Sequence, residues 1–144
     1  MDLFSSKKRF RLAITNLVYP YIKNISRATH HIVNLIQRNG ILIVSIPHPC
    51  FNQDTNQDWF WNPNIHDLII TDYFNENVFS KKLGDLSTYH YHRILETYTE
   101  IFSSHNLNIL RIIEPKPVNK EDSIFNKASK NPFYLIFVLR YSSI

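Results

Sequence analysis

The residue best suited to acid–base chemistry is His48, which follows an apolar run and stands between Pro47 and Pro49. An imidazole has a reference pKa of about 6.5, so it can accept a proton near neutral pH. His48 is therefore a candidate general base. The alternative is that His48 only hydrogen-bonds the backbone at the end of a strand, and the sequence leaves both interpretations open.

Aromatic and cationic side chains later in the chain are candidates for binding a small molecule. Arg93 could clamp an acidic substrate, or it could form an ion pair with a carboxylate such as Glu114. The aromatic rings could line an apolar pocket or pack in the core. The predicted substrate-binding set consists of Trp59, Trp61, Tyr89, Tyr91, His92 and Arg93.

Two closely spaced pairs, one of a histidine with a cysteine and one of two histidines, suggest a metal site. His48-x-Cys50 and His90-x-His92 have spacings that occur in zinc sites. If His90 and His92 lie on a helix, however, they point to different faces. We therefore predict no metal site.

The elements that position His48 begin with the apolar run Ile41–Ile46, which predicts a strand buried on both faces. Upstream, Phe10–Val18 predicts another strand, followed by a helix with Ser26 as its N-cap and Gly40 as its end. A strand, a helix and a strand form a crossover unit, so the two strands should be parallel. Ligands bind at the carboxyl edge of open α/β sheets, where His48 lies.

The second half of the chain starts with residues 52–86, which lack regular periodicity but are rich in aromatic residues. Because such a composition argues against disorder, we predict a lid-like insert. We expect one α/β domain over residues 1–144, with a mixed sheet of about four strands and flanking helices. The later elements expected are a helix starting near Ser87 or Thr88 and ending near His105, and strands Leu107–Ile113 and Phe133–Tyr141.

Composition narrows the classes of function. The chain has 144 residues and a net charge of +4, and Lys7-Lys8-Arg9 is its tightest basic cluster, which is too small for a nucleic-acid footprint. One cysteine excludes an internal disulfide and fits a reducing compartment. No apolar run approaches the ~20 residues of a membrane span. We expect a cytoplasmic protein that binds neither nucleic acid nor membrane.

Six stretches follow one another in a set order along the chain. They are Ala13–Ile22, Gly40–Ile46, Pro47-His48-Pro49-Cys50-Phe51, Tyr91–Tyr98, Glu114–Pro117 and Asn131–Leu135. In this order they resemble the C-terminal half of a class I S-adenosylmethionine-dependent methyltransferase of the type 11-like subgroup. The resemblance matches them, in turn, to the family's fourth strand and its turn, its fifth strand, the His-Pro-Cys-Phe that ends that strand, the His-Arg helix, the Glu-Pro turn and the last strand. It implies a partial Rossmann-like methyltransferase fold that begins at the family's fourth strand.

The resemblance also indicates what this chain lacks. The family holds S-adenosylmethionine mainly with the first half of its fold, through a glycine-rich turn and an acidic residue. The two glycines of this chain do not follow its first strand. Of the cofactor-facing wall, the resemblance assigns only Asn16, Leu17 and Tyr19. It implies that the chain alone does not bind the cofactor and that a second polypeptide supplies the cofactor-binding half.

Two hypotheses follow. In the first, the chain is the acceptor-side portion of a methyltransferase that methylates a small molecule, and it is inactive alone. In the second, it is a non-catalytic remnant or an interaction module that pairs through an exposed sheet edge. Binding of S-adenosylmethionine and concentration-dependent association are the observations that separate them.

Overall fold

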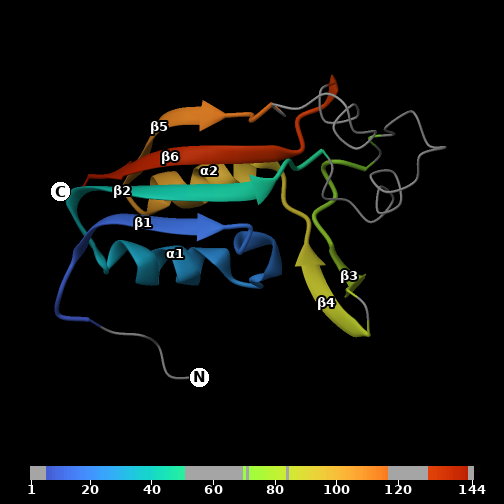
Figure 1. Ribbon diagram of the computed structural model, residues 1–144, viewed down its shortest axis with the longest axis horizontal. Coiled ribbons are helices and arrows are strands. Elements are labelled where there is room, and N and C mark those ends of the chain that lie inside the picture. Colours follow the sequence, from blue (N-terminus) through green and yellow to red (C-terminus); the bar gives the residue numbers. More distant parts are fainter. Residues whose placement is uncertain (1–5, 51–69, 71, 84, 117–129, 143–144) are drawn as a thin grey trace.

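The computed structural model describes residues 6–50, 70, 72–83, 85–116 and 130–142. No helix in these ranges is long and apolar enough to cross a membrane. The elements form an α/β arrangement, which confirms the predicted fold class (Figure 1). In chain order they are β1 (Phe10–Asn16), the 3-10 helix η1 (Tyr19–Tyr21), α1 (Ile25–Val33), β2 (Ile36–Pro47), β3 (Val78–Leu83), β4 (Leu86–Tyr91), α2 (Leu95–Ser104), β5 (Leu107–Ile113) and β6 (Tyr134–Tyr141).

Four of the strands form one mixed sheet in the order β1-β2-β6-β5. β1 and β2 are parallel, as the crossover unit predicts, and β6 is antiparallel to both of its neighbours. Because of this, β1, β2 and β5 run in the same direction and end at the same edge of the sheet (Figure 1). The run Ile41–Ile46 lies in β2 between two other strands, so the prediction of a central strand is confirmed. The prediction that both faces of this strand are buried is wrong, because only Leu42, Val44 and Ile46 are buried and the residues between them are partly exposed.

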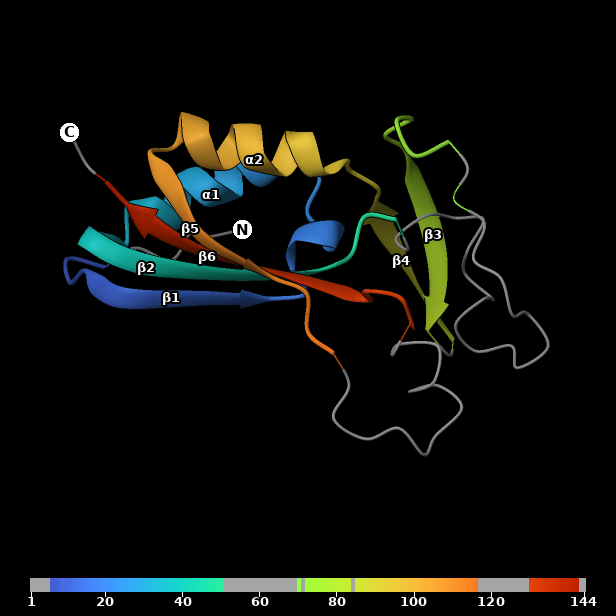
Figure 2. The same cartoon turned by 90° about the horizontal axis from the view of Figure 1, so that it is seen from above.

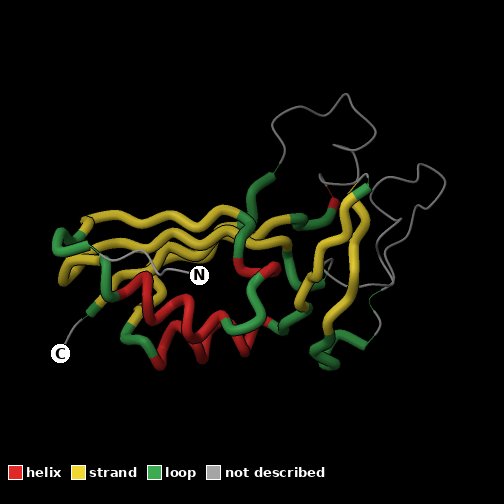
Figure 3. The backbone as a smooth tube through the Cα atoms, turned by 90° about the horizontal axis from the view of Figure 1, so that it is seen from below, coloured by secondary structure: helices red, strands yellow, loops and turns green. Residues whose placement is uncertain are grey.

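The main core lies between the sheet and its two α-helices, which cover the same face (Figure 2 and Figure 3). Phe102 of α2 packs edge-on against Phe137 of β6, with ring centroids 5.1 Å apart. Burying an aliphatic side chain contributes about 2 kcal/mol of stability, because apolar surface leaves water. The sheet residues buried beneath the helices alternate along β2 and β6 and are Leu42, Val44, Ile46, Leu135, Phe137 and Leu139.

The opposite face of the sheet is covered by no described element (Figure 2). Paired residues of neighbouring strands share a face, and Leu12 pairs with Ile41 and Ile14 with Ile43. Leu12 is 50% exposed and Ile14 is 62% exposed. We call this apolar surface the open face, and its members are Leu12, Ile14, Ile41, Ile43, Ile136 and Val138.

The ends of α1 differ from the prediction. Its N-cap is Asn24 rather than Ser26, because the Asn24 side chain accepts a hydrogen bond from the backbone N–H of Arg27 at 2.9 Å. The helix ends at Val33, and Gly40 lies inside β2 rather than at the helix end. The chain therefore leaves the helix earlier and pairs with β1 over a longer strand.

Gly40 is needed for close packing within an irregular part of β2. The register of β1 against β2 shifts in this stretch, and the preceding residue, Asn39, has a left-handed φ of 61°. A Cβ on Gly40 would lie 2.5 Å from Cγ2 of Ile36 and 2.8 Å from the main-chain oxygen of Gln37. Only glycine fits such a close approach of the backbone to itself.

A β-hairpin occupies the stretch where the sequence predicts the end of an irregular insert and the start of a helix. β3 and β4 pair antiparallel as a separate two-stranded sheet. α2 begins at Leu95, so the predicted helix start near Ser87 is wrong, and Tyr89 and Tyr91 lie on a strand. The spacing of Tyr91, Leu95 and Tyr98 fits a helix, but pairing with β3 determines the structure before residue 92.

Candidate functional site

Three polar residues gather at the carboxyl edge of the sheet. Asn16 ends β1, His48 follows β2 and Glu114 follows β5. Because these three strands run in the same direction, the residues share the edge at which open α/β sheets bind ligands. The hairpin lies beyond the same edge (Figure 1), and His90 of β4 lies with its ring centroid 4.3 Å from that of Tyr21 in η1. This edge is the candidate site.

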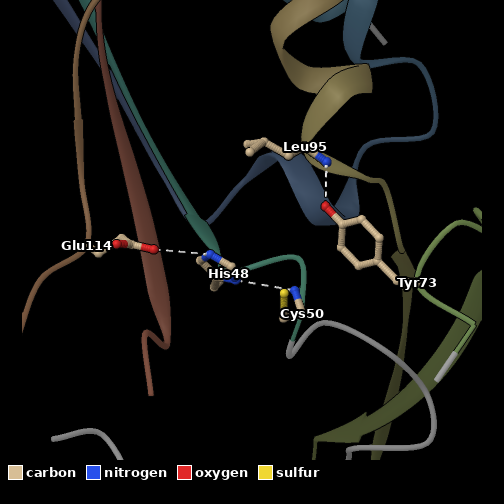
Figure 4. A network of polar contacts seen from close by, with 5 residues as sticks. All are labelled: His48, Cys50, Tyr73, Leu95 and Glu114. Atoms are coloured by element: carbon tan, nitrogen blue, oxygen red, sulfur yellow. Dashed lines mark hydrogen bonds and ion pairs between the residues drawn. The ribbon is translucent and has the colours of Figure 1, made fainter. Parts of the chain in front are cut away.

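His48 is held by contacts of both its main chain and its ring. Its N–H donates to the main-chain oxygen of Phe133 at 2.8 Å, which extends the β2–β6 pairing by one residue. The ring Nδ1 accepts a hydrogen bond from the N–H of Cys50 at 3.3 Å. The ring Nε2 lies 3.4 Å from Oε1 of Glu114 (Figure 4). His48 therefore makes the expected backbone contact and also a contact with a carboxylate.

The surroundings of His48 favour its neutral form. Burial lowers the pKa of His48 below its usual range, and the nearby Glu114 carboxylate offsets part of this change. The ring is therefore neutral at pH 7, which is the state that a general base requires. Burial raises the pKa of the Cys50 thiol, so this thiol stays protonated at neutral pH and is not an activated nucleophile.

The residues assigned to a cofactor-facing wall lie at the end of β1 and in η1. The carbonyl Oδ1 of Asn16 accepts a hydrogen bond from the Ser45 hydroxyl, and the N–H of Leu17 donates to the Ser45 main-chain oxygen at 3.0 Å. Leu17 has a φ of 56°, a left-handed conformation that costs a non-glycine residue about 1 kcal/mol. Tyr19 is 1% exposed, and its hydroxyl lies 3.0 Å from that of Thr29. Asn16 and Leu17 thus lie at the edge, whereas the Tyr19 side chain lies in the core.

Arg93 is buried and holds the loop between η1 and α1. Its guanidinium donates to the main-chain oxygens of Tyr19 at 3.3 Å, Ile22 at 2.6 Å and Lys23 at 2.9 Å. The guanidinium carbon also lies 5.0 Å from the centroid of the Tyr91 ring. Hydrogen bonds from a charged donor are about twice as strong as neutral ones. Arg93 therefore ties the start of α2 to the loop after β1, and its role in substrate binding remains a prediction.

The segment before the hairpin is attached to the N-terminus of α2. The ring Nε2–H of His92 donates to the main-chain oxygen of Tyr73 at 2.8 Å. The Tyr73 hydroxyl accepts a hydrogen bond from the N–H of Leu95 at 3.0 Å (Figure 4), and the Glu76 carboxylate accepts one from the N–H of Ile94 at 2.9 Å. These side chains satisfy N–H groups that have no partner within the helix. The negative charge of Glu76 also interacts favourably with the helix dipole.

His90 lies on β4 and His92 directly follows that strand, so the prediction that the two histidines lie on a helix is wrong. His90 stacks on Phe79, with ring centroids 5.6 Å apart, and also contacts Tyr21. His92 is 2% exposed and donates to the main chain of Tyr73. Among the residues that the structure describes, no cluster of metal-ligating side chains could hold an ion.

The remaining predicted residues are not brought together. Tyr89 lies on β4 with 69% of its surface exposed, and Trp59 and Trp61 lie outside the described residues. The ion pair expected between Arg93 and Glu114 is replaced by the contact between Glu114 and His48. Sequence reasoning missed this partner of His48, because the two residues follow strands that are separated by β6 and only the folded sheet brings them together.

Comparison with solved structures identifies the kind of fold. A Listeria monocytogenes protein, provisionally described as an S-adenosylmethionine-dependent methyltransferase, matches with a TM-score of 0.84 and 22% identity over 99% of this chain. A methyltransferase of the same kind from Mesorhizobium loti matches with a TM-score of 0.69 and 17% identity over 91% of this chain. One from Clostridium acetobutylicum matches with a TM-score of 0.62 and 11% identity over 98% of this chain.

These likenesses confirm that the chain has a class I methyltransferase-like α/β fold. The chain spans 66% of the length of the Listeria protein and 62% of each of the other two. The sequence matches no protein-family model and no curated protein.

Proposed function

We propose that this chain is the acceptor-binding part of an S-adenosylmethionine-dependent methyltransferase that methylates a small molecule. The observation that carries the proposal is the 3.4 Å contact between His48 Nε2 and Glu114 Oε1 at the carboxyl edge of a methyltransferase-like sheet. Methyl transfer requires alignment of the acceptor with the methyl donor, and often a base that removes the proton of the acceptor. The neutral, partly buried imidazole of His48 is our candidate for that base.

The described residues fit only one side of a cofactor site. S-adenosylmethionine supplies a methyl group bound to a positively charged sulfur, which is released as a neutral thioether. Asn16 and Leu17 would form a wall of its site, since they lie at the carboxyl edge of β1. The glycines of the sequence, Gly40 and Gly84, do not follow β1, so this chain supplies no glycine-rich turn. We infer that the chain alone does not bind the cofactor and that a second polypeptide in the cytoplasm completes the site.

The acceptor pocket in this proposal lies between the carboxyl edge and the hairpin. The contact of His90 with Tyr21 brings β4 next to this edge. His92 and Arg93 act through the main-chain segments that they hold. The rings of Trp59, Trp61, Tyr89 and Tyr91 are the proposed apolar lining.

Isothermal titration calorimetry with S-adenosylmethionine tests the proposal. The titrant is added to the purified chain and to the chain co-expressed with the polypeptide encoded immediately upstream. We expect no measurable binding by the chain alone and saturable binding by the co-expressed pair. Tight binding by the chain alone, or no binding by the pair, would contradict the proposal.

The same pair allows a test of methyl transfer. Transfer of a labelled methyl group into a small-molecule extract is measured for the wild type, for His48→Gln and for the control Arg38→Gln, which changes an exposed residue of β2. We expect His48→Gln to lose about 100-fold in transfer, as removal of a general base typically does, while cofactor binding is kept. Equal transfer by His48→Gln and Arg38→Gln would exclude His48 as the base.

A non-catalytic interaction module is the second candidate, and the open face favours it. Leu12 and Ile14 are 50% and 62% exposed on β1, the edge strand of the sheet. Exposed apolar surface and sheet edges both favour association with another chain. Sedimentation velocity at several concentrations tests this candidate. Association without any binding of S-adenosylmethionine would favour the module, and a clean monomer at high concentration would exclude self-pairing.

A further inference from the structure

Glu114 and His48 meet although their strands are not neighbours. β6 lies between β2 and β5, yet the residues that directly follow those two strands come within 3.4 Å of each other. Ile46, two residues before His48, is buried under the helices. Ile112, two residues before Glu114, pairs with Phe137, which is also buried there. Because alternate residues of a strand face the same side, the side chains of His48 and Glu114 both point toward the helix-covered side of the sheet. This shared side explains why they meet.

The contacts of the His48 ring determine which nitrogen carries the proton. A backbone N–H can only donate, so Nδ1, which lies 3.3 Å from the Cys50 nitrogen, accepts and carries no proton. The proton of the neutral ring is then on Nε2, which lies 3.4 Å from the Glu114 carboxylate. The two contacts on opposite sides of the ring thus select the same tautomer.

We propose that Glu114 is a positioning residue: it holds His48 in the Nε2–H tautomer, so that Nδ1, on the Cys50 side, takes the proton of the methyl acceptor. The inference rests on the proposed function. As the acceptor oxygen or nitrogen bonds to the methyl carbon, its bond to hydrogen breaks and the electrons of that bond stay on the acceptor atom. The proton moves to Nδ1 after the N–H of Cys50 has given up its hydrogen bond to this nitrogen. The positive ring then faces the Glu114 carboxylate, which stabilises it.

The surroundings of the pair are consistent with this role. The His48 side chain is 16% exposed and that of Glu114 is 55% exposed, so the pair lies at the boundary between protein and solvent. The other titratable group that the structure describes at this loop is Cys50, whose thiol stays neutral because burial raises its pKa. Among the described residues, Glu114 is therefore the charge that acts on His48.

Nuclear magnetic resonance of the histidine ring nitrogens tests the proposal on the purified chain, without a substrate. Long-range proton–nitrogen spectra are recorded over pH for the wild type, Glu114→Gln and Glu114→Ala, and His48→Gln assigns the signals. The control Glu100→Gln makes the same charge change on an exposed residue of α2. We expect the Nε2–H tautomer in the wild type, and a lower pKa of His48 in both Glu114 variants than in the control.

Two results would overturn the proposal: an Nδ1–H tautomer in the wild type, or a pKa of His48 that Glu114→Gln shifts no further than Glu100→Gln does. Circular dichroism checks that each variant is folded, and if Glu114→Ala is not, the isosteric Glu114→Gln decides alone. The readout is separate from that of the proposed function. If the co-expressed pair fails to bind S-adenosylmethionine, the proposed function is contradicted. The tautomer of His48 measured by nuclear magnetic resonance remains valid, but it then has no role in methyl transfer.

In the co-expressed pair, the pH dependence of methyl transfer gives the second readout. A residue that only stabilised the fold would lower the rate equally at all pH values. We expect Glu114→Gln to move the acid limb of the transfer profile to lower pH, because His48 then loses its proton at lower pH. A profile whose shape is unchanged would contradict the proposal.

Discussion

The guanidinium Nη2 of Arg93 lies 2.6 Å from the main-chain oxygen of Ile22, a residue 71 positions earlier in the chain. This contact joins the loop after β1, which carries the proposed cofactor wall, to the start of α2, where the proposed acceptor side begins. Buried main-chain oxygens need hydrogen-bond donors, and the Arg93 guanidinium supplies donors to those of Ile22 and Lys23 as well as to that of Tyr19. Arg93 therefore connects the two sides of the candidate site through the backbone.

Replacing Arg93 is expected to destabilise the fold. Arg93→Lys keeps the charge, but an ammonium cannot reproduce the fork that reaches the three carbonyls. We expect a loss of about 2–4 kcal/mol in the free energy of unfolding, measured by urea denaturation. The control Arg38→Lys changes an exposed residue of β2 and should stay within about 0.5 kcal/mol of the wild type. Equal stability of the two variants would show that the carbonyl contacts contribute little.

Gly40→Ala should also destabilise the fold, because the added Cβ would meet the backbone. The nearest atoms are Cγ2 of Ile36 at 2.5 Å and the main-chain oxygen of Gln37 at 2.8 Å. We expect a loss of about 1–3 kcal/mol in a urea or thermal melt, as for other overpacked sites. Asn39→Gly is the matched control, since its φ of 61° suits glycine and little should change. An Ala variant as stable as the control would contradict the close packing.

Stability should fall as the solution is acidified, because burial lowers the pKa of both His48 and His105. In the unfolded chain these groups have a pKa of about 6.5, so below that pH the unfolded chain binds protons more readily than the folded one. The contribution of the two neutral histidines to stability is fully present above about pH 6.5. It is lost as the pH falls through the pKa values that these histidines have in the folded chain.

Urea denaturation at pH 7.5 and at pH 5 measures this loss, and the double variant His48→Gln, His105→Gln should lose less stability than the wild type. His31→Gln serves as a control for a histidine substitution in α1. The same loss in the wild type and the double variant would assign the acid sensitivity to other groups.

The open face can be made polar without damage to the core. Ile14 is 62% exposed, so we expect Ile14→Lys to change the free energy of unfolding by less than about 0.5 kcal/mol. We expect the same change to reduce association with the proposed second polypeptide, or self-association, in sedimentation velocity experiments. Lys130→Gln, an exposed change away from β1, is the control. Unchanged association would show that partners bind elsewhere.

The central part of the fold could be predicted from local pattern. The apolar run Ile41–Ile46 indicates a central strand, although only one of its two faces is fully buried. A helix between two strands specifies a parallel pair. The hairpin could not be predicted in this way. The tyrosines of β4 also fit helical spacing, and the residues of β3 include two lysines, Lys81 and Lys82, which weaken the strand signal.

The contacts of the candidate site depend on topology rather than on motifs. His48 was predicted at the carboxyl edge because it follows a buried strand. The contact of His48 with Glu114 depends on how β2, β6 and β5 are arranged in the sheet, and no local sequence pattern predicts this arrangement. Arg93 binds main-chain oxygens, and these are present at every residue, so the sequence carries no sign of which ones it contacts.

The one-sided arrangement of the helices has a consequence for substitutions in the sheet. Alternate residues of β2 and β6 face either the helices or the open face. Substitutions at Ile43 or Val138, on the open face, therefore leave the buried residues under the helices unchanged. Side chains on the open face can therefore change their polarity while the interior and its folding remain the same.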